Sequence, residues 1–191
     1  MLTILVLISI FVIQVLGHGR VTSPKPRGGG TKHQAACGAA VAKVLSSDPA
    51  GPIENAVAKI DSSYNATACH LYFCRGYNVG VSPNRWEDNT SNTRKYKAGQ
   101  VVPFTIDIVA HHTGTANVSV VNLTTQKVIG SPLIYWKVYS NTSIPISQKP
   151  ANETAFNVTI PSLPSGHYAL QWWWWAYSNK QTYESCIDFT I

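Results

Sequence analysis

From residue 100 onward, the chain is a succession of segments rich in β-branched and aromatic residues, separated by short turn sequences. In the segment 154–160, Phe156, Val158 and Ile160 alternate with polar residues, so one face of an extended strand would be buried. This pattern predicts an all-β fold, an antiparallel β-sandwich of the immunoglobulin-like or fibronectin type. The expected strands are Val101–Ala110, Ala116–Asn122, Lys127–Tyr139, Thr154–Ile160, His167–Trp175 and Glu184–Ile191.

The part of the chain before residue 100 lacks this pattern and predicts long loops with short helices. Val21–Gly30 is rich in glycine and proline and is expected to form an ordered loop. Ala35–Leu45 is rich in alanine, and Ile53–Ile60 carries apolar residues at helical spacing, so each predicts a short helix. The sequence has no internal repeat and no linker, and residues 18–191 are therefore expected to form one domain.

Four consecutive tryptophans, Trp172–Trp175, stand near the end of the chain. Alternation along a strand sends Trp172 and Trp174 to one side and the other two to the opposite side, so at least one pair belongs to the core. Flat aromatic faces also stack on sugar rings, and Trp175 and Tyr177, near the strand end, are the candidates for an exposed platform. The core interpretation is preferred for the tract as a whole.

The composition excludes several classes of protein. Charged residues make up 13% of the chain, against about 25% in a typical soluble protein, which excludes disorder caused by high charge. The net charge of +6 favours acidic partners, but lysine and arginine occur singly or in pairs and no nucleic-acid motif is present. The sequence has no G-x-S-x-G, no H-E-x-x-H and no phosphate loop, and it shows no identifiable pair of glycosidase carboxylates.

The first 17 residues carry no charged side chain and predict a secretion signal. The apolar segment Leu2–Leu16 is shorter than the roughly 20 residues that a helix needs to cross a bilayer. Val15 and Gly17 are small enough for the −3 and −1 positions of a signal-peptidase site, so cleavage would make His18 the new N-terminus. We therefore expect a secreted, extracellular protein with no membrane association after cleavage.

Two further features are typical of an exported protein. The four cysteines are an even number, as expected in an oxidising compartment, and they allow three pairings. The expected pairing joins Cys69 to Cys74 across a short loop and leaves Cys37 with Cys186. Seven sequons for N-glycosylation indicate a glycoprotein, although some of them could be buried. Their asparagines are Asn65, Asn89, Asn117, Asn122, Asn141, Asn152 and Asn157.

An N-terminal histidine would offer two nitrogen ligands to one metal ion, its α-amine and its imidazole. The α-amine has a pKa of about 7.7 to 8.0 and loses its proton readily to a competing divalent metal. One more imidazole would complete a T-shaped plane of three nitrogens, an arrangement that favours Cu(II). The alternative is that His18 merely happens to follow a cleavage site.

His111 and His112 are the candidates for the third nitrogen ligand. They follow the expected strand 101–110, and neighbours on a strand point to opposite faces, so both cannot reach one ion without a bend. Strand parity does not choose between them, because the strand is expected to end there. The remaining histidines are expected to be ordinary surface or hydrogen-bonded residues. They are His33, His70 and His167.

Gln181 and Tyr183 lie two residues apart and would share one face of a strand. A phenol and a primary amide placed together could serve as an axial metal ligand and as a hydrogen-bond partner for oxygen. The alternative is a buried tyrosine whose hydroxyl is satisfied by a neighbour.

Taken together, several segments resemble the lytic polysaccharide monooxygenases, with auxiliary activity family sixteen as the closest expected match. The resemblance covers nearly all of the chain after residue 17, and the order and spacing of the segments make it specific. The segments include His18–Pro24, Ala36–Gly38, His112–Val120, Ile129–Trp136, Gln171–Trp174 and Gln181–Cys186.

The resemblance implies a histidine brace, a copper site in which His18 supplies its amine and side chain and His112 supplies the third nitrogen. His112 is preferred over His111 because Thr-Gly follows it in the family-like segment. Tyr183 would lie axially and Gln181 just behind the ligands. One copper ion is expected per chain, which is expected to be a monomer.

The implied reaction is oxidative cleavage of β-1,4-glycosidic bonds in an insoluble polysaccharide at C1 or C4. Cellulose is the first expectation and chitin the second, with O2 or H2O2 as oxidant and a small molecule or protein as electron donor. The stretch beginning at Trp175-Ala176-Tyr177 departs from the family pattern and bears on substrate preference. The alternative is a secreted copper-binding or carbohydrate-binding protein without turnover, and a glycoside hydrolase ranks behind both.

Overall fold

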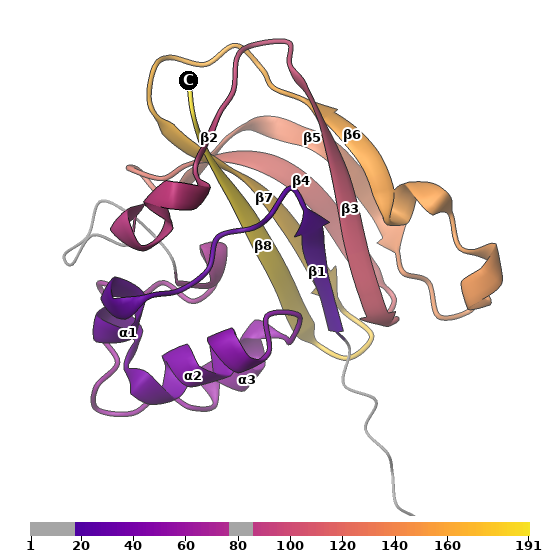
Figure 1. The fold of residues 1–191 in the computed structure, drawn as a ribbon. Helices are drawn as coiled ribbons and strands as arrows, with labels where there is room; N and C mark the ends of the chain where they lie inside the picture. The colour runs from indigo at the N-terminus through magenta and orange to yellow at the C-terminus, as the bar shows by residue number, and fades with distance from the viewer. Residues whose placement is uncertain (1–17, 77–85) are drawn as a thin grey trace, which may run out of the picture.

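Two antiparallel β-sheets pack face to face in the computed structural model, which describes residues 18–76 and 86–191 (Figure 1). The expected secretion signal, residues 1–17, lies outside the described residues. One sheet has the strand order β1-β3-β6 and the other β2-β8-β7-β4-β5. The strands are β1 (His18–Ser23), β2 (Arg94–Lys95), β3 (Val101–Ala110), β4 (Gly114–Asn122), β5 (Lys127–Tyr139), β6 (Ala155–Thr159), β7 (His167–Ala176) and β8 (Gln181–Thr190).

The registers confirm the antiparallel β-sandwich that the alternating segments predict. In the smaller sheet, β3 pairs with β1 on one side and β6 on the other, both antiparallel. In the larger sheet, β7 pairs along its full length with β4 and β8. The short strand β2 adds to the edge of β8 in the parallel sense.

The alternation of the tryptophan tract decides the centre of the core. Trp172 and Trp174 are fully buried between the sheets, whereas Trp173 is half-buried and Trp175 is exposed on the opposite face. Tyr177 is exposed as well. The same periodicity holds in β6, where polar side chains face solvent and Val158 is buried. The core interpretation of the tract is therefore confirmed.

The helices lie along one side of the sandwich, next to β8, and enclose a second small core. They are α1 (Thr31–Cys37), α2 (Ala39–Ser47) and α3 (Ile53–Val57). Where one helix was expected over 35–45, two occur, because Gly38 adopts φ +80 between them. A Cβ at this position would lie 2.4 Å from the Oγ atom of Ser63. Among the described residues, no helix has the length and apolar character required to span a membrane.

Short 3-10 turns complete the described chain and belong to its loops. They are η1 (Cys74–Gly76), η2 (Trp86–Asn92), η3 (Ile146–Gln148) and η4 (Ala151–Glu153). In η1, Arg75 has a φ of 56, which places it in the left-handed region. This turn is held against β8, because the main-chain nitrogens of Cys74 and Arg75 donate to the two carboxylate oxygens of Glu184 at 2.6 and 2.9 Å.

The expected disulfide pairing is wrong. The bonds join Cys37 to Cys69 and Cys74 to Cys186. Cys37 and Cys69 belong to the small core under the helices, whereas η1 brings Cys74 against β8, where Cys186 lies. Tertiary packing thus overrides the short local loop. In the loop-entropy model, closing a loop as long as the one between Cys74 and Cys186 contributes about 5 kcal/mol.

Candidate metal centre

The ends of five strands meet at one end of the sandwich, the lower end in Figure 1. There β1 begins where β3 ends, since His18 pairs with Ala110. At the same end β4 begins at Gly114, and β7 and β8 are joined by the turn that follows the Ala176–Gln181 pair. The segments that carry His18, the pair His111-His112 and Tyr183 are therefore neighbours in space, although more than 160 positions separate the outer two in sequence.

His18 is held in place by the loop that follows α2. Its Nε2 atom lies 3.0 Å from the Oδ2 atom of Asp48, and the next main-chain nitrogen, of Gly19, donates to the carbonyl of Ala50 at 2.9 Å. A carboxylate at Nε2 orients the imidazole and increases its basicity as a metal ligand. The other ring nitrogen, Nδ1, is the one that can form a chelate ring together with the main-chain nitrogen of the same residue.

His111 and His112 occupy the turn between β3 and β4 and have different surroundings. The Nδ1 atom of His111 lies 2.8 Å from the Oγ atom of Ser140, just beyond the end of β5. Burial lowers the pKa of His111, and the positive charge of Lys149 lowers it further. The turn itself is tied to the β7–β8 turn by a hydrogen bond from the nitrogen of Ser178 to the carbonyl of Thr113, at 3.2 Å. His111 is thus engaged with the β5 side of the turn.

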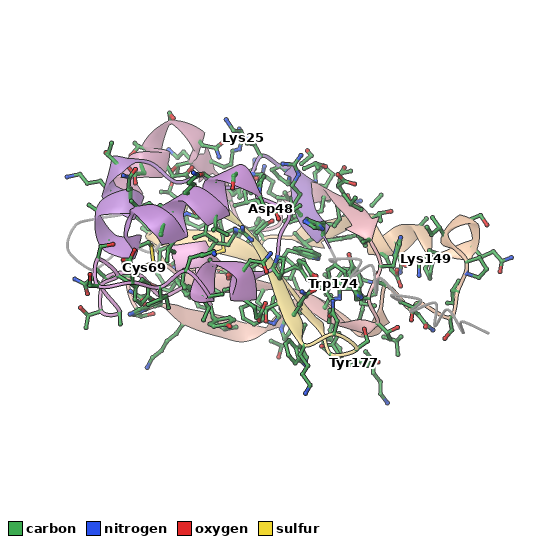
Figure 2. The ribbon with its side chains drawn as sticks, turned by 90° about the horizontal axis from the view of Figure 1, so that it is seen from below. Lys25, Asp48, Cys69, Lys149, Trp174 and Tyr177 are labelled. Carbon is green, nitrogen blue, oxygen red and sulfur yellow. A yellow bond between two sulfur atoms is a disulfide. The ribbon has the colours of Figure 1, made fainter. Side chains whose placement is uncertain are left out.

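Trp174 packs against all three candidate segments. Its indole stacks on the ring of Tyr183, with 4.4 Å between ring centroids and 28° between planes. A Cβ atom on Gly19 would lie 2.9 Å from this indole, and one on Gly114 would lie 2.8 Å from its Nε1 atom. Figure 2, which views the molecule from this end, places Trp174 between Asp48 and Tyr177. The glycines next to the histidines are therefore required by the close approach of the indole.

Tyr183 and Gln181 form a hydrogen-bonded pair, as their expected common face on β8 predicts. The hydroxyl of Tyr183 donates to the Oε1 atom of Gln181 at 2.5 Å, and the amide of Asn179 donates to the same oxygen at 2.5 Å. Tyr183 is fully buried, and burial raises the pKa of its hydroxyl well above the ordinary value. The phenol therefore remains protonated at neutral pH, with its hydroxyl satisfied by a neighbour.

Two acidic residues beside the site were not singled out by the sequence. Asp48 contacts His18, and Glu54 accepts a hydrogen bond from the main-chain nitrogen of Thr182 at 2.9 Å. The negative charges of both carboxylates add to the raised pKa of Tyr183. Turn residues after position 47 indicate a loop at Asp48, but no local pattern indicates that this loop meets the first strand. Asn179 and the glycines at 19 and 114 were missed for the same reason.

The remaining histidines lie outside this end of the sandwich. His33 is buried in α1, and His167 begins β7 at the opposite end, where it pairs with Thr190. His70 contacts the side chain of Gln126 in the β4–β5 turn. The cysteines that approach His33 and Glu184 are all in disulfides, so these groupings are not thiolate metal sites.

The matching family model has the description lytic polysaccharide mono-oxygenase, cellulose-degrading, and it covers residues 18–189. The chain belongs to this family. This lytic polysaccharide monooxygenase is accordingly a copper-dependent enzyme that acts on polysaccharide. The expected closest match to auxiliary activity family sixteen is not supported, and the comparisons point to family ten instead.

Solved structures share the fold. An auxiliary activity family ten lytic polysaccharide monooxygenase from Streptomyces lividans matches with a TM-score of 0.52 and 20% identity, over 91% of this chain and 100% of that one. A chitin binding domain from Burkholderia pseudomallei matches with a TM-score of 0.46 and 17% identity, over 91% and 98%. A Bacillus amyloliquefaciens protein in complex with Cu(I) matches with 0.41 and 14%, over 86% and 75%. A comparison with curated protein sequences finds no match.

Proposed function

We propose that His18 and His112 hold the copper ion of this monooxygenase, with Tyr183 in the axial position. The observation that carries the proposal is Trp174, which packs at once against Tyr183 and against the glycines at 19 and 114. Nitrogen donors in one plane and a weak, neutral oxygen donor on the axis are a donor set that suits Cu(II). The residues at this end of the sandwich therefore fit the cofactor of the family.

His18 would contribute both its α-amine and its Nδ1 atom. This requires removal of residues 1–17 as a secretion signal, and the start of the family match at residue 18 supports that boundary. The contact of Asp48 with Nε2 supports the assignment of Nδ1 to the metal. Secretion of the mature enzyme belongs to the same proposal, because the amine exists only after cleavage.

His112 is proposed as the third nitrogen ligand, rather than His111. The contact between His111 Nδ1 and Ser140 occupies that ring on the β5 side of the turn. Burial and Lys149 lower the pKa of His111, so it stays neutral without a metal. His111 is proposed as a positioning residue that holds the turn in place.

Gln181 is proposed to position the oxygen co-substrate. Because its Oε1 atom accepts from both Tyr183 and Asn179, the amide is oriented so that Nε2 remains as the donor. When bound, copper supplies the one-electron chemistry that activates O2 or H2O2 and removes a hydrogen atom at C1 or C4 of a sugar ring. The buried Tyr183 and Trp174 keep water away from the inner side of the site.

The proposed substrate is cellulose, with chitin as the second candidate. The description of the matching family names cellulose degradation. Trp175 and Tyr177 are 38% and 46% exposed beside the strand ends, and exposed aromatic rings can stack on the sugar units of a polymer surface. An enzyme that acts as a monomer with an external electron donor completes the proposal.

The test is mass spectrometry of the products formed from cellulose by the copper-loaded mature enzyme, with and without ascorbate. We expect oxidised oligosaccharides only with ascorbate, and their loss in His112→Ala. His111→Ala is the matched control and should keep most of the activity. Activity that survives His112→Ala but not His111→Ala would overturn the ligand assignment. Copper binding without any oxidised product, from cellulose or chitin, would indicate a binding protein without turnover.

A further inference from the structure

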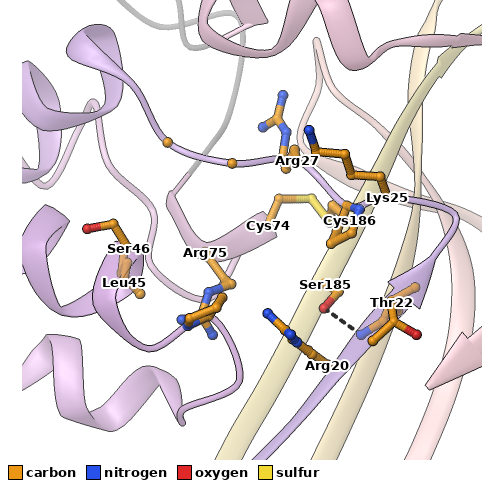
Figure 3. A pocket seen from close by; sticks show the side chains of 15 residues that line it. Arg20, Thr22, Lys25, Arg27, Leu45, Ser46, Cys74, Arg75, Ser185 and Cys186 are labelled. Carbon is orange, nitrogen blue, oxygen red and sulfur yellow. Dashed lines mark hydrogen bonds between the residues drawn. A yellow bond between two sulfur atoms is a disulfide. The ribbon is translucent and has the colours of Figure 1, made fainter. Parts of the chain in front are cut away.

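A second cavity, of about 450 Å³, opens on the helical side of the sandwich. It lies between β1 with the loop that follows it, α2, η1 and β8, as Figure 3 shows. Its volume falls in the range of about 300–1,000 Å³ that is typical of small-molecule sites. The strand ends that form the metal centre are not part of its lining. The lining residues are Arg20–Thr22, Lys25–Gly29, Leu45, Ser46, Pro49, Cys74, Arg75, Ser185 and Cys186.

The interior of the cavity is mostly apolar. Val21 and Leu45 are buried and contribute aliphatic side chains from opposite walls. The disulfide between Cys74 and Cys186 forms part of the same surface. Ser185 is not available as a polar partner in full, because its Oγ atom already accepts from the main-chain nitrogen of Val21 at 3.1 Å. Such a surface suits the flat, apolar body of an organic molecule.

The charged side chains that line the cavity are all basic. Arg27 is compensated, because its guanidinium is paired with the buried carboxylate of Asp188 at 2.5 Å. Arg75 donates to the carbonyls of Gly51 and Asp48 at 2.9 and 3.0 Å, and hydrogen bonds to carbonyls do not neutralise its charge.

Arg20 and Lys25 are the two uncompensated cations of the cavity. Within residues 18–76 and 86–191, the side chains of Arg20 and Lys25 make no hydrogen bond or ion pair. In Figure 3 the Arg20 guanidinium reaches across toward Arg75. Two guanidinium groups that approach each other without an intervening carboxylate repel, and an anion between them would remove this repulsion.

We propose that this cavity binds a small organic anion, a carboxylate carried on an apolar ring. The carboxylate would accept hydrogen bonds from the Arg20 guanidinium, with Lys25 and Arg75 adding positive charge. The ring would lie against Val21, Leu45 and the disulfide. An inorganic anion alone would leave the apolar part of the cavity unfilled, and a neutral ring would leave the cations uncompensated.

Isothermal titration of the copper-loaded mature enzyme with benzoate tests the proposal, with benzyl alcohol and sulfate as comparison ligands. We expect benzoate to bind at least about tenfold more tightly than either of them. Arg20→Gln should weaken benzoate binding by about tenfold or more, and Lys25→Gln, a change at an exposed residue, should weaken it in the same direction. Lys127→Gln, an exposed lysine at the start of β5, is the control and should leave binding unchanged.

Three outcomes would overturn the proposal. Equal binding of benzoate and benzyl alcohol would mean that the cations do not recognise the ligand, and equal binding of sulfate would mean that the apolar surface does not. Loss of benzoate binding in His112→Ala would mean that the carboxylate binds at the metal centre. Retention of binding in that variant supports the cavity whether or not the proposed copper ligands are correct.

Discussion

The Nε2 atom of His18 lies 3.0 Å from a carboxylate oxygen of Asp48, which stands thirty positions later at the end of α2. The contact joins the first residue of β1 to the helical side of the molecule. It is reinforced one residue later, where Gly19 donates to the carbonyl of Ala50. The proposed metal ligand is thus held by the segment between two helices, and not by the sandwich alone.

This contact predicts that Asp48→Asn weakens copper binding. An amide at this position orients the imidazole less well and does not raise its basicity, and the loss of such a partner typically costs 10–100-fold in metal affinity. The measurement is a competition titration with a chelator of known affinity for copper. Asp107→Asn, an exposed aspartate on β3, is the matched control. Unchanged affinity in Asp48→Asn would remove Asp48 from the site.

The close approach of Trp174 predicts that both flanking glycines resist substitution, but to different degrees. In Gly19→Ala the new Cβ would meet the indole at 2.9 Å, and we expect a loss of about 1–3 kcal/mol in the free energy of unfolding. In Gly114→Ala it would lie 2.1 Å from the main-chain oxygen of Trp175, which cannot move without disturbing the β4–β7 pairing, so the loss should be larger.

Urea unfolding of these two variants provides the measurement. Gly28→Ala is the control, because a Cβ there meets no atom within 4 Å. If Gly114→Ala were as stable as Gly28→Ala, the described packing around Trp174 would be incorrect.

Trp174 and Trp175 should separate stability from substrate binding. Trp174 is fully buried, so Trp174→Ala should lower the free energy of unfolding by about 3–5 kcal/mol. Trp175 is 38% exposed, and Trp175→Ala should cost less than about 1 kcal/mol. The exposed ring is proposed to contact the polymer, so Trp175→Ala should instead reduce adsorption to cellulose, as measured by depletion from solution. A large loss of stability in Trp175→Ala would contradict the alternation of β7.

The raised pKa of Tyr183 predicts a loss of stability at alkaline pH. The ordinary pKa of 10.0 applies to the unfolded chain, and burial raises the pKa of the folded state above it. The contribution to stability is therefore fully present below pH 10 and is lost as the pH rises from there through the folded pKa, since the unfolded state releases its proton first.

Unfolding measured at several pH values tests this prediction. Tyr183→Phe should show a shallower decline above pH 10 than the unmodified protein. Tyr177→Phe, a change at an exposed tyrosine, should decline as steeply as the unmodified protein. Identical slopes for all three proteins would mean that Tyr183 does not titrate differently in the folded state.

The surroundings of the sequons predict which asparagines stay unmodified. Asn89 is 4% exposed, and its amide donates to the buried carboxylate of Asp188 at 2.7 Å, so a glycan on this nitrogen is incompatible with the fold. Asn65, Asn152 and Asn157 are exposed and are the expected sites of modification. Peptide mapping of the secreted protein, before and after enzymatic removal of glycans, measures occupancy. Full occupancy at Asn89 would contradict the placement of its amide.

Much of the fold could be predicted because it depends on strand geometry alone. Side chains alternate with a period of two, so the burial of Trp172 and Trp174 and the exposure of Trp175 follow from their positions. The pairing of Gln181 with Tyr183 follows from the same spacing. These relationships span only a few residues and survive whatever the rest of the chain does.

Other relationships depend on how distant segments pack, and no local pattern contains them. The expectation that Cys69 bonds Cys74 failed because η1 is held against β8 by Glu184, which carries Cys74 to Cys186. The same packing of loops and helices against β8 and β1 brings Asp48 to His18.

The sequence by itself determined the sandwich, the buried side of each strand and the residue types of the proposed copper site, since each is encoded in a short periodic pattern or a local motif. Only the tertiary structure decided the disulfide partners, the separate surroundings of His111 beside Ser140, and the basic cavity around Arg20. These depend on contacts between segments far apart in the chain, whose positions are set by the packing of the whole molecule.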